Sequence, residues 1–365
     1  MSLPQMMKDV WDNHFESLTP MMKNYLETKK QHEDCIIFYR LGDFYEMFFD
    51  DALEASKVME ITLTGKSCGL EERAPMCGVP YHAVDMYINK LVTRGYKVCI
   101  VEQAEDPALA KGLVKREVSR IVTPGTNLNL TAMDEGKNNY LMSIAYIGGK
   151  FGISIADVTT GDYYVTEVYS ERNVLDEINK FMPTEIICNH AFLMCGMDID
   201  DIKNRLSISV FELEEWYFDE NNCSEVLKDH FRIMDLSGLG ISEMSLGVIA
   251  SGSLLKYLYE TQKNSLTHLS KLVPYSTSTF MILDTSTRRN LELCETLREK
   301  QKRGSLLWVL DKTKTAMGAR TLRGYIEQPL ISKEKIINRQ KVIEELNKSI
   351  ITRDELREYL SPIYD

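Results

Sequence analysis

The hydrophobic pattern of this chain changes its period twice, and these changes limit the folds that the chain can adopt. Up to about Gly125, short apolar runs typical of strands alternate with amphipathic helical patterns. Residues 21–32 have helical spacing, whereas 35–42 and 96–103 are strand-like. Alternation of this kind predicts a mixed α/β domain, which we place at residues 1–122.

The middle of the chain opens with a different pattern. Three β-like runs follow one another with glycine-containing turns between them, at residues 140–149, 151–161 and 162–169. Such closely spaced runs predict a three-stranded meander. A helical pattern at 171–181 and a strand-like run at 184–189 come next. This order predicts an α/β or α+β domain over residues 127–262.

From about Met244 nearly all of the chain has helical spacing. The predicted helices lie at residues 245–263, 288–300, 305–313 and 334–349. We therefore expect a helical region over residues 263–365. The sequence stops at Asp365 without a helix-terminating signal, so we expect this region to be an incomplete part of a larger helical domain.

The charge of the chain is distributed unevenly. The formal net charge is −11, which by itself disfavours nucleic-acid binding. Residues 1–126 have a net charge of −4, residues 127–262 of −13 and residues 263–365 of +6. The middle segment thus holds the acidity. A polyanion is expected to contact the first or the last segment and to avoid the middle one.

Several classes of protein are disfavoured by composition. No apolar run reaches the roughly 18–20 residues of a membrane span, and the first residues lack the pattern of a secretory signal. The eight cysteines include no CxxC pair, so we expect buried, reduced thiols and no metal site. These features predict a cytoplasmic protein, and for a DNA-binding one a nucleoid-associated protein.

One short motif resembles a phosphate-binding loop but lacks its essential residues. Gly65-Lys66-Ser67 matches the end of a P-loop, yet the position that needs the first glycine is Glu60. Without glycines, successive backbone N–H groups cannot converge on a phosphate. The sequence therefore predicts no nucleotide cofactor in these residues.

A metal-dependent nuclease is the alternative from another functional class. Asp157 lies late in the second predicted strand of the meander, and Asp162 opens the third. Two-metal phosphoryl chemistry requires several carboxylates that converge on the ions. Only these two lie near the strands, so turn and strand-end roles are the favoured interpretation.

The stretch Gly42-Asp43-Phe44-Tyr45-Glu46 is the most informative motif. We expect Asp43 to cap a helix over residues 44–60. At about 100° per residue, the core face of that helix is one stripe, made of Tyr45, Phe48, Phe49, Ala52, Ser56 and Met59. Phe44 and Glu46 then flank the stripe in the first turn. Phe44 is either exposed at this junction or packed sideways into the core.

The same stretch resembles the Phe-x-Glu mismatch-recognition motif of the MutS family. Further segments resemble that family in its own order, at residues 18–29, 74–103, 111–126, 283–293 and 306–330. In that family, the aromatic residue that matches Phe44 enters the minor groove and stacks on a mispaired or unpaired base. The carboxylate that matches Glu46 hydrogen-bonds that base.

The resemblance also implies further contacts and partners. Phosphate contacts are expected from Lys115 and Arg116, and from Met76 and His82 in a loop over residues 75–82. The middle segment corresponds to a connector domain with a ribonuclease H-like fold, no nuclease chemistry and a role in receiving MutL. The helical region corresponds to the beginning of the core or lever domain.

Other properties implied by the family concern the full-length protein. Its ATPase and main dimerisation elements, with their ATP and magnesium, are expected beyond residue 365. This chain is therefore expected to be a non-enzymatic DNA-binding part that holds no cofactor. We expect it to be monomeric or weakly associated, whereas the full-length protein is expected to be a homodimer.

Overall fold

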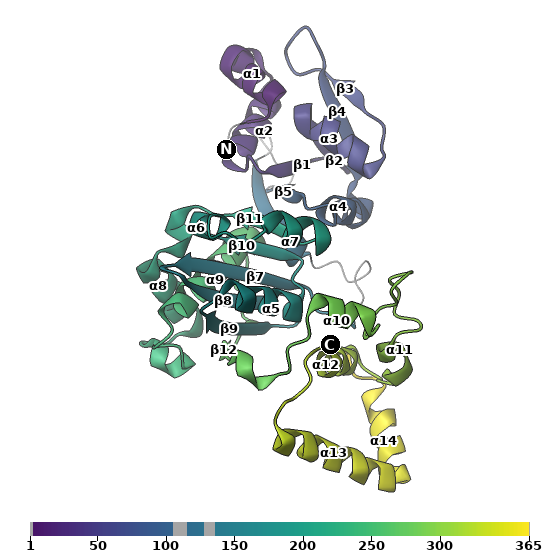
Figure 1. Ribbon diagram of the computed structural model, residues 1–365. Helices are drawn as coiled ribbons and strands as arrows, with labels where there is room; N and C mark the ends of the chain where they lie inside the picture. Colours follow the sequence, from purple (N-terminus) through teal and green to yellow (C-terminus); the bar gives the residue numbers. More distant parts are fainter. Residues whose placement is uncertain (1–2, 105–114, 128–135, 365) are drawn as a thin grey trace. The chain divides into compact units, whose positions relative to one another are not determined.

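The computed structural model describes residues 3–104, 115–127 and 136–364 and divides into two compact units (Figure 1). The first unit comprises Met1–Ala132 and Tyr257–Leu266, and the second Met133–Lys256 and Thr267–Asp365. As the sequence predicted, the chain combines mixed α/β parts with a helical C-terminal part.

A six-stranded sheet with the strand order β3-β4-β2-β1-β5-β6 forms the first unit. Its strands are β1 (Cys35–Leu41), β2 (Phe44–Phe48), β3 (Thr64–Lys66), β4 (Ala74–Pro80), β5 (Lys97–Gln103) and β6 (Arg116–Val122). β1 and β5 are parallel, and all other neighbours are antiparallel. The predicted strands at 35–42 and 96–103 are confirmed.

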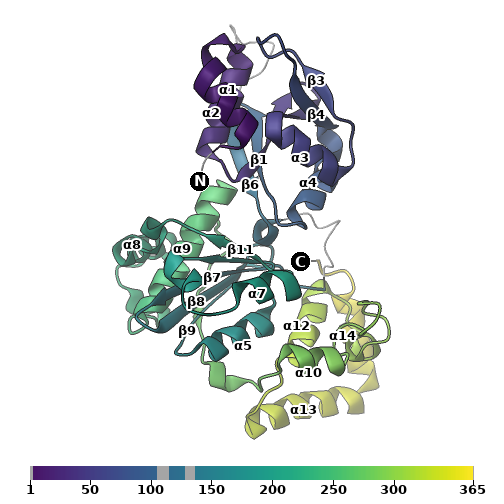
Figure 2. The ribbon, with the colours of Figure 1, turned by 45° about the horizontal axis from the view of Figure 1, so that its top comes forward.

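Helices cover both faces of this sheet (Figure 2). α1 (Gln5–His14) and α2 (Pro20–Gln31) pack on the face that holds Tyr39 and Phe48, here called the α1–α2 face. α3 (Phe49–Met59) and α4 (Val84–Val92) pack on the opposite face with Phe38 and Met47. Alternate residues of each strand point to opposite faces, so one sheet supports two cores. The predicted helix at 21–32 is confirmed as α2.

The single helix predicted over residues 44–60 is wrong. Phe44–Phe48 forms strand β2, and α3 begins only at Phe49, whose φ of +53° marks the break. Asp43 therefore lies in a hairpin turn instead of capping a helix. Tyr45 and Met47 are both buried, as strand alternation requires. The predicted core stripe is nevertheless buried throughout, although Phe48 and Phe49 lie in the core under α1 and α2 and the other apolar members in the core on the opposite face.

A buried ion pair fixes α3 to its neighbours. The Lys29 Nζ of α2 lies 2.9 Å from Asp51 Oδ1, and both side chains are almost fully buried. Asp51 also accepts hydrogen bonds from the Tyr25 hydroxyl at 2.9 Å and from the Ile37 backbone N–H at 3.0 Å. One carboxylate therefore joins α2, α3 and β1.

The second unit contains a six-stranded sheet with the order β11-β10-β7-β8-β9-β12. Its strands are β7 (Tyr140–Ile147), β8 (Lys150–Asp157), β9 (Asp162–Val168), β10 (Glu185–Cys188), β11 (Ser209–Glu212) and β12 (Val273–Pro274). β7, β8 and β9 form the predicted antiparallel meander, and β10 and β11 continue it in parallel. This order agrees with the expected ribonuclease H-like arrangement.

Helices lie on both sides of the second sheet as well. α5 (Glu171–Phe181), α6 (His190–Leu193) and α7 (Ile199–Arg205) pack on one face. α8 (Glu220–Phe231) and the first part of α9 (Ser245–Gln262) pack on the other. A Cβ at Gly152 of β8 would lie 2.0 Å from the Leu246 carbonyl oxygen, so a glycine is required where α9 meets the sheet.

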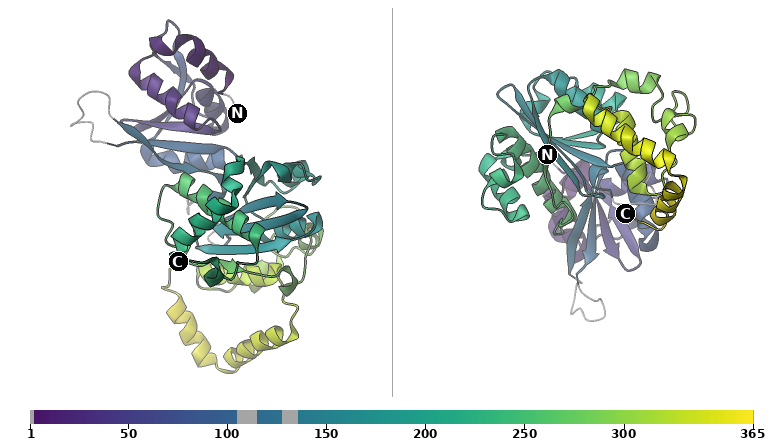
Figure 3. Two further views of the ribbon diagram at one scale, coloured as in Figure 1. Left: turned by 90° about the vertical axis from the view of Figure 1, so that its left-hand side faces the viewer. Right: turned by 90° about the horizontal axis from the view of Figure 1, so that it is seen from below.

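The C-terminal region contains α10 (Thr285–Asn290), α11 (Leu306–Leu310), α12 (Ala316–Glu327), α13 (Lys333–Lys348) and α14 (Ile350–Leu360), the last two drawn in yellow in Figure 3. The helix predicted over 288–300 is wrong beyond Asn290. Glu292 and Lys300 have positive φ angles, which a continuous helix does not allow. Among the described residues, no helix is both long and apolar enough to cross a bilayer.

Candidate nucleic-acid interface

The hairpin between β1 and β2 presents Phe44 to solvent. Gly42 and Asp43 form its two-residue turn, and Gly42 has a φ of +58°, a conformation that glycine adopts without strain. The turn is closed by the pair Leu41 and Phe44. Phe44 is 46% exposed, whereas Tyr45 beside it is buried. Of the two predicted alternatives for Phe44, the exposed position is confirmed.

Glu46 lies two residues further along β2 and therefore on the same sheet face as Phe44. Its carboxylate Oε2 is 2.5 Å from the Lys66 Nζ of β3, and its side chain is 17% exposed. Across β4, Glu46 pairs with Gly78. A Cβ on Gly78 would lie 3.4 Å from Glu46 Cγ, so the absence of a side chain there leaves the carboxylate uncovered from that side.

Arg116 and Met76 contribute to the same unit in different ways. The Arg116 Nε of β6 donates to the Arg40 carbonyl oxygen at 3.1 Å, and its guanidinium lies over the Tyr39 ring at 5.0 Å. Arg116 therefore lies next to the hairpin strand β1. Met76 pairs with Phe48 across β2 and β4 and packs against the core under α1 and α2. Its partial burial limits any contact with a ligand.

His82 and Lys115 are both exposed. His82 lies in the 3₁₀ turn Tyr81–Ala83. The Tyr81 N–H of this turn donates to the Asp43 carbonyl oxygen of the hairpin at 3.0 Å. The predicted loop over residues 75–82 is wrong, because most of it forms strand β4. Lys115 precedes β6 and forms an ion pair of 2.5 Å with Glu117.

Sequence reasoning missed Arg40 and Tyr81 in addition to Lys66. The Arg40 Nε donates to the Gly42 carbonyl oxygen at 2.6 Å, and its guanidinium lies 4.1 Å from the centre of the exposed Tyr81 ring. The arginine thus lies at the base of the Phe44 hairpin. Reading residues 44–48 as a strand would have identified it, since Arg40 then lies at the end of the partner strand.

The side of this hairpin opposite the α1–α2 face is held by Tyr45. Its hydroxyl donates to the Glu102 carboxylate, and Arg40 also lies over its ring at 5.3 Å. Burial, reinforced by the hydrogen bond to Glu102, raises the pKa of the Tyr45 phenol well above its ordinary value. Tyr45 therefore remains a neutral donor that anchors the strand on which Phe44 and Glu46 are displayed.

Asp157 and Asp162, the residues of the nuclease alternative, are engaged in local hydrogen bonds. Asp157 is buried and accepts from the Asn138 side chain at 2.8 Å and from the Thr159 hydroxyl at 2.6 Å. Asp162 accepts from the Thr160 hydroxyl at 3.1 Å. Within the part of the chain that the structure describes, no three metal-binding side chains gather into a site. The carboxylates serve the turn between β8 and β9.

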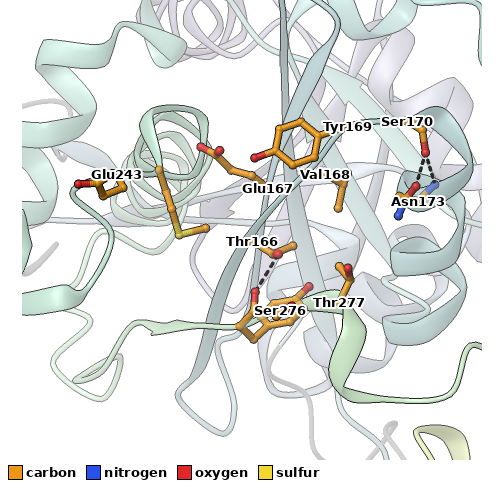
Figure 4. Close-up of a pocket in the computed structure, with 11 residues that line it drawn as sticks. Thr166, Glu167, Val168, Tyr169, Ser170, Asn173, Glu243, Ser276 and Thr277 are labelled. Atoms are coloured by element: carbon orange, nitrogen blue, oxygen red, sulfur yellow. Dashed lines mark hydrogen bonds between the residues drawn. The ribbon is translucent and has the colours of Figure 1, made fainter. Parts of the chain in front are cut away.

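A recess in the second unit lies along the outer edge of β9 (Figure 4). β12 pairs with β9 as far as Val165, and beyond it the Thr166 hydroxyl donates to the Tyr275 carbonyl oxygen at 2.9 Å. Glu167 and Glu243 are among the lining residues, and Glu167 accepts a hydrogen bond from the Gly247 N–H at 2.9 Å. Two carboxylates would repel a phosphate backbone, so this recess is not part of the candidate nucleic-acid interface.

Comparison with known proteins identifies three successive parts of the chain. Three protein-family models match the chain: MutS domain I over residues 19–131, MutS domain II over 139–270 and MutS domain III over 286–365. The predicted limits at 1–122, 127–262 and 263–365 remain predictions beside these matches.

The chain is also similar to proteins named DNA mismatch repair protein MutS. The one from Lachnoclostridium phytofermentans is 64% identical over 348 residues, which cover 95% of this chain and 37% of the relative. Those from Ruminiclostridium cellulolyticum and Acetivibrio thermocellus are 53% and 50% identical, and each match covers 96% of this chain and 40% of the relative. The chain thus spans about two-fifths of the length of these curated relatives.

Proposed function

This chain belongs to the MutS family, and from that premise we propose that its first unit recognises mispaired or unpaired bases in double-stranded DNA. The observation that carries the proposal is the position of Phe44. It is an aromatic ring, 46% exposed, at the end of a tight hairpin whose strands are otherwise anchored in two cores. Such a ring is held rigidly and yet is free to enter a groove.

The energetics of insertion explain why this arrangement favours a mismatch. An apolar wedge that enters the minor groove must unstack a base step, at a cost of about a few kcal/mol. That cost is lowest where base pairing is already broken. Phe44 therefore reads the deformability of the duplex and not its sequence.

Glu46 supplies the second element of recognition. We assign to its carboxylate the hydrogen bond to the displaced base, since Glu46 shares the sheet face of Phe44. A carboxylate also repels phosphates, so it makes intact duplex a poorer ligand. Arg40, Arg116, Lys115 and His82 are the candidates for phosphate contacts, which position the protein without reading sequence.

The proposal is tested by measuring binding to two fluorescent duplexes that differ only in a G·T mismatch. We expect Phe44→Ala to reduce the ratio of mismatched to perfectly paired affinity to about one, because it removes the wedge. Met86→Ala is the matched control, since Met86 is an exposed apolar residue of α4 on the opposite face of the sheet. An unchanged ratio in Phe44→Ala refutes the wedge.

Glu46→Ala tests the second element with the same duplexes. We expect it to strengthen binding to the perfectly paired duplex, because the repulsion between its carboxylate and the phosphates is removed. Equal or weaker binding to the paired duplex contradicts that role.

Partners of the full-length protein follow from the same family membership. We propose that the acidic middle segment, residues 127–262, receives MutL. We also propose that the full-length protein is a homodimer and that its ATPase and magnesium lie in the part of the relatives that this chain does not span. The net charge of −13 over residues 127–262 supports docking of a basic surface there. Salt should weaken the capture of purified MutL by this segment, because salt screens exposed charges. Capture that does not change with salt contradicts the electrostatic contact.

A further inference from the structure

We propose that Lys66 is a positioning residue that sets the discriminating power of Glu46. This inference rests on the proposed function, because it concerns how the same site distinguishes two duplexes. Lys66 ends the edge strand β3, twenty positions from Glu46 in the sequence, and its ammonium reaches the Glu46 carboxylate.

The geometry restrains both side chains. The Lys66 Nζ lies 2.5 Å from Glu46 Oε2 and 5.6 Å from the centre of the Phe48 ring. The side chain of Lys66 is 35% exposed and that of Glu46 17%. A lysine side chain normally samples many rotamers, and here an aromatic ring and a carboxylate restrict it.

The pair leaves part of the carboxylate available. Lys66 engages Oε2, and among the described residues no hydrogen bond reaches Oε1. Gly78, the cross-strand partner of Glu46, carries no side chain that covers this group. The carboxylate is thus fixed through one oxygen, while the other is available to a donor on a base.

The charge of Lys66 matters most in the mismatched complex. Insertion of Phe44 brings Glu46 against the bases and removes water from it. A carboxylate that is desolvated without a cation is strongly disfavoured. On perfectly paired DNA the carboxylate stays farther from the bases and keeps more of its water. Loss of the ammonium should therefore weaken the mismatched complex more than the perfectly paired one.

The test measures affinity by fluorescence anisotropy for a duplex with one unpaired thymine and for its perfectly paired counterpart. We expect Lys66→Met to lower the ratio of the two affinities by roughly five-fold, which corresponds to about 1 kcal/mol. Lys66→Arg, which keeps the positive charge, should leave the ratio within about two-fold of that of the unsubstituted chain. Lys57→Met, at an exposed position of α3, is the matched control and should leave the ratio unchanged.

A double-mutant cycle separates positioning from other roles. In a Glu46→Gln background, Lys66→Met should change the ratio by less than about two-fold, because the charge that it positions is gone. An equal fall of the ratio in that background overturns the inference. The inference is also overturned if Lys66→Met weakens binding to both duplexes equally and lowers the slope of log affinity against log salt concentration by about one. That result identifies a phosphate contact.

The same measurements distinguish this inference from the proposed function. If Phe44→Ala abolishes discrimination while Lys66→Met leaves the ratio intact, only the role of Lys66 is refuted. If the unsubstituted chain binds both duplexes equally, mismatch recognition itself is refuted, and the role of Lys66 with it. Circular dichroism of each variant identifies loss of fold, and Lys66→Arg then decides whether the positive charge matters.

Discussion

The buried ion pair of Lys29 and Asp51 offers the sharpest test of how the first unit is held together. Asp51→Asn keeps the size of the side chain but leaves the Lys29 ammonium buried without an anion. Breaking a buried pair in this way costs about 3–5 kcal/mol. A domain is typically stable by about 5–15 kcal/mol, so this single change should remove a large part of that stability.

The partner variant adds a quantitative constraint. Lys29→Met removes the ammonium and leaves the carboxylate with the Tyr25 hydroxyl and the Ile37 N–H as its donors. It should therefore also destabilise the unit. The double variant buries neither charge, and a pair replaced by uncharged groups is often close to neutral. We expect the double variant to lose less stability than Asp51→Asn alone.

Urea unfolding measures these differences if the first unit is observed by itself. Trp11 of α1 packs against the first core, and the other two tryptophans, Trp216 and Trp308, lie in the second unit. Replacing those two with phenylalanine makes Trp11 the only tryptophan reporter. Losses that simply add in the double variant, or a cost below about 1 kcal/mol for Asp51→Asn, refute the reasoning.

Two further predictions concern titratable groups. Burial raises the pKa of most cysteine thiols, to about 12 for Cys77, Cys99, Cys188, Cys223 and Cys294. The partly exposed Cys195 should therefore be the first of the eight thiols to react with iodoacetamide at pH 8, as peptide mapping can show, and early labelling at a buried cysteine contradicts this. Burial alone raises the pKa of Asp34, but the Lys97 ammonium at 2.8 Å outweighs it and holds that pKa below its ordinary value. The stability from Asp34 is thus present above the ordinary pKa and is lost as the pH falls through the lowered one, so Asp34→Asn should flatten the acid side of the stability profile.

The sequence predicted most elements of the fold because their apolar runs are long enough to distinguish a helical period from a strand period. The meander and α5 follow from three alternating runs and one amphipathic stretch. The five residues of β2 are too few for this. Tyr45, Phe48 and Phe49 are buried in either a strand or a helix, so their pattern alone could not place the boundary.

The candidate site was predictable only where it is local in sequence. Phe44 and Glu46 are two residues apart, and both a strand and the first turn of a helix leave them near the surface. The link between Glu46 and Lys66 depends on β3 pairing with β4 and β4 with β2. No short-range pattern encodes that register, and the motif around Lys66 instead suggested a phosphate loop. The pairing of edge strands therefore decides which residues complete the site.

A segment with a negative net charge can still carry a locally positive surface at the proposed DNA site. Residues 1–126 have a net charge of −4, but this sum does not say where in the fold the charges lie. Asp51 is paired with Lys29, and Glu46 with Lys66. Arg40 at the hairpin instead contacts a backbone carbonyl and two aromatic rings, so its positive charge is not offset by those contacts. A phosphate responds to the local potential of such groups and not to the sum over the segment. Net charge misjudges this surface because the fold, through its pairings, determines which charges remain at the hairpin.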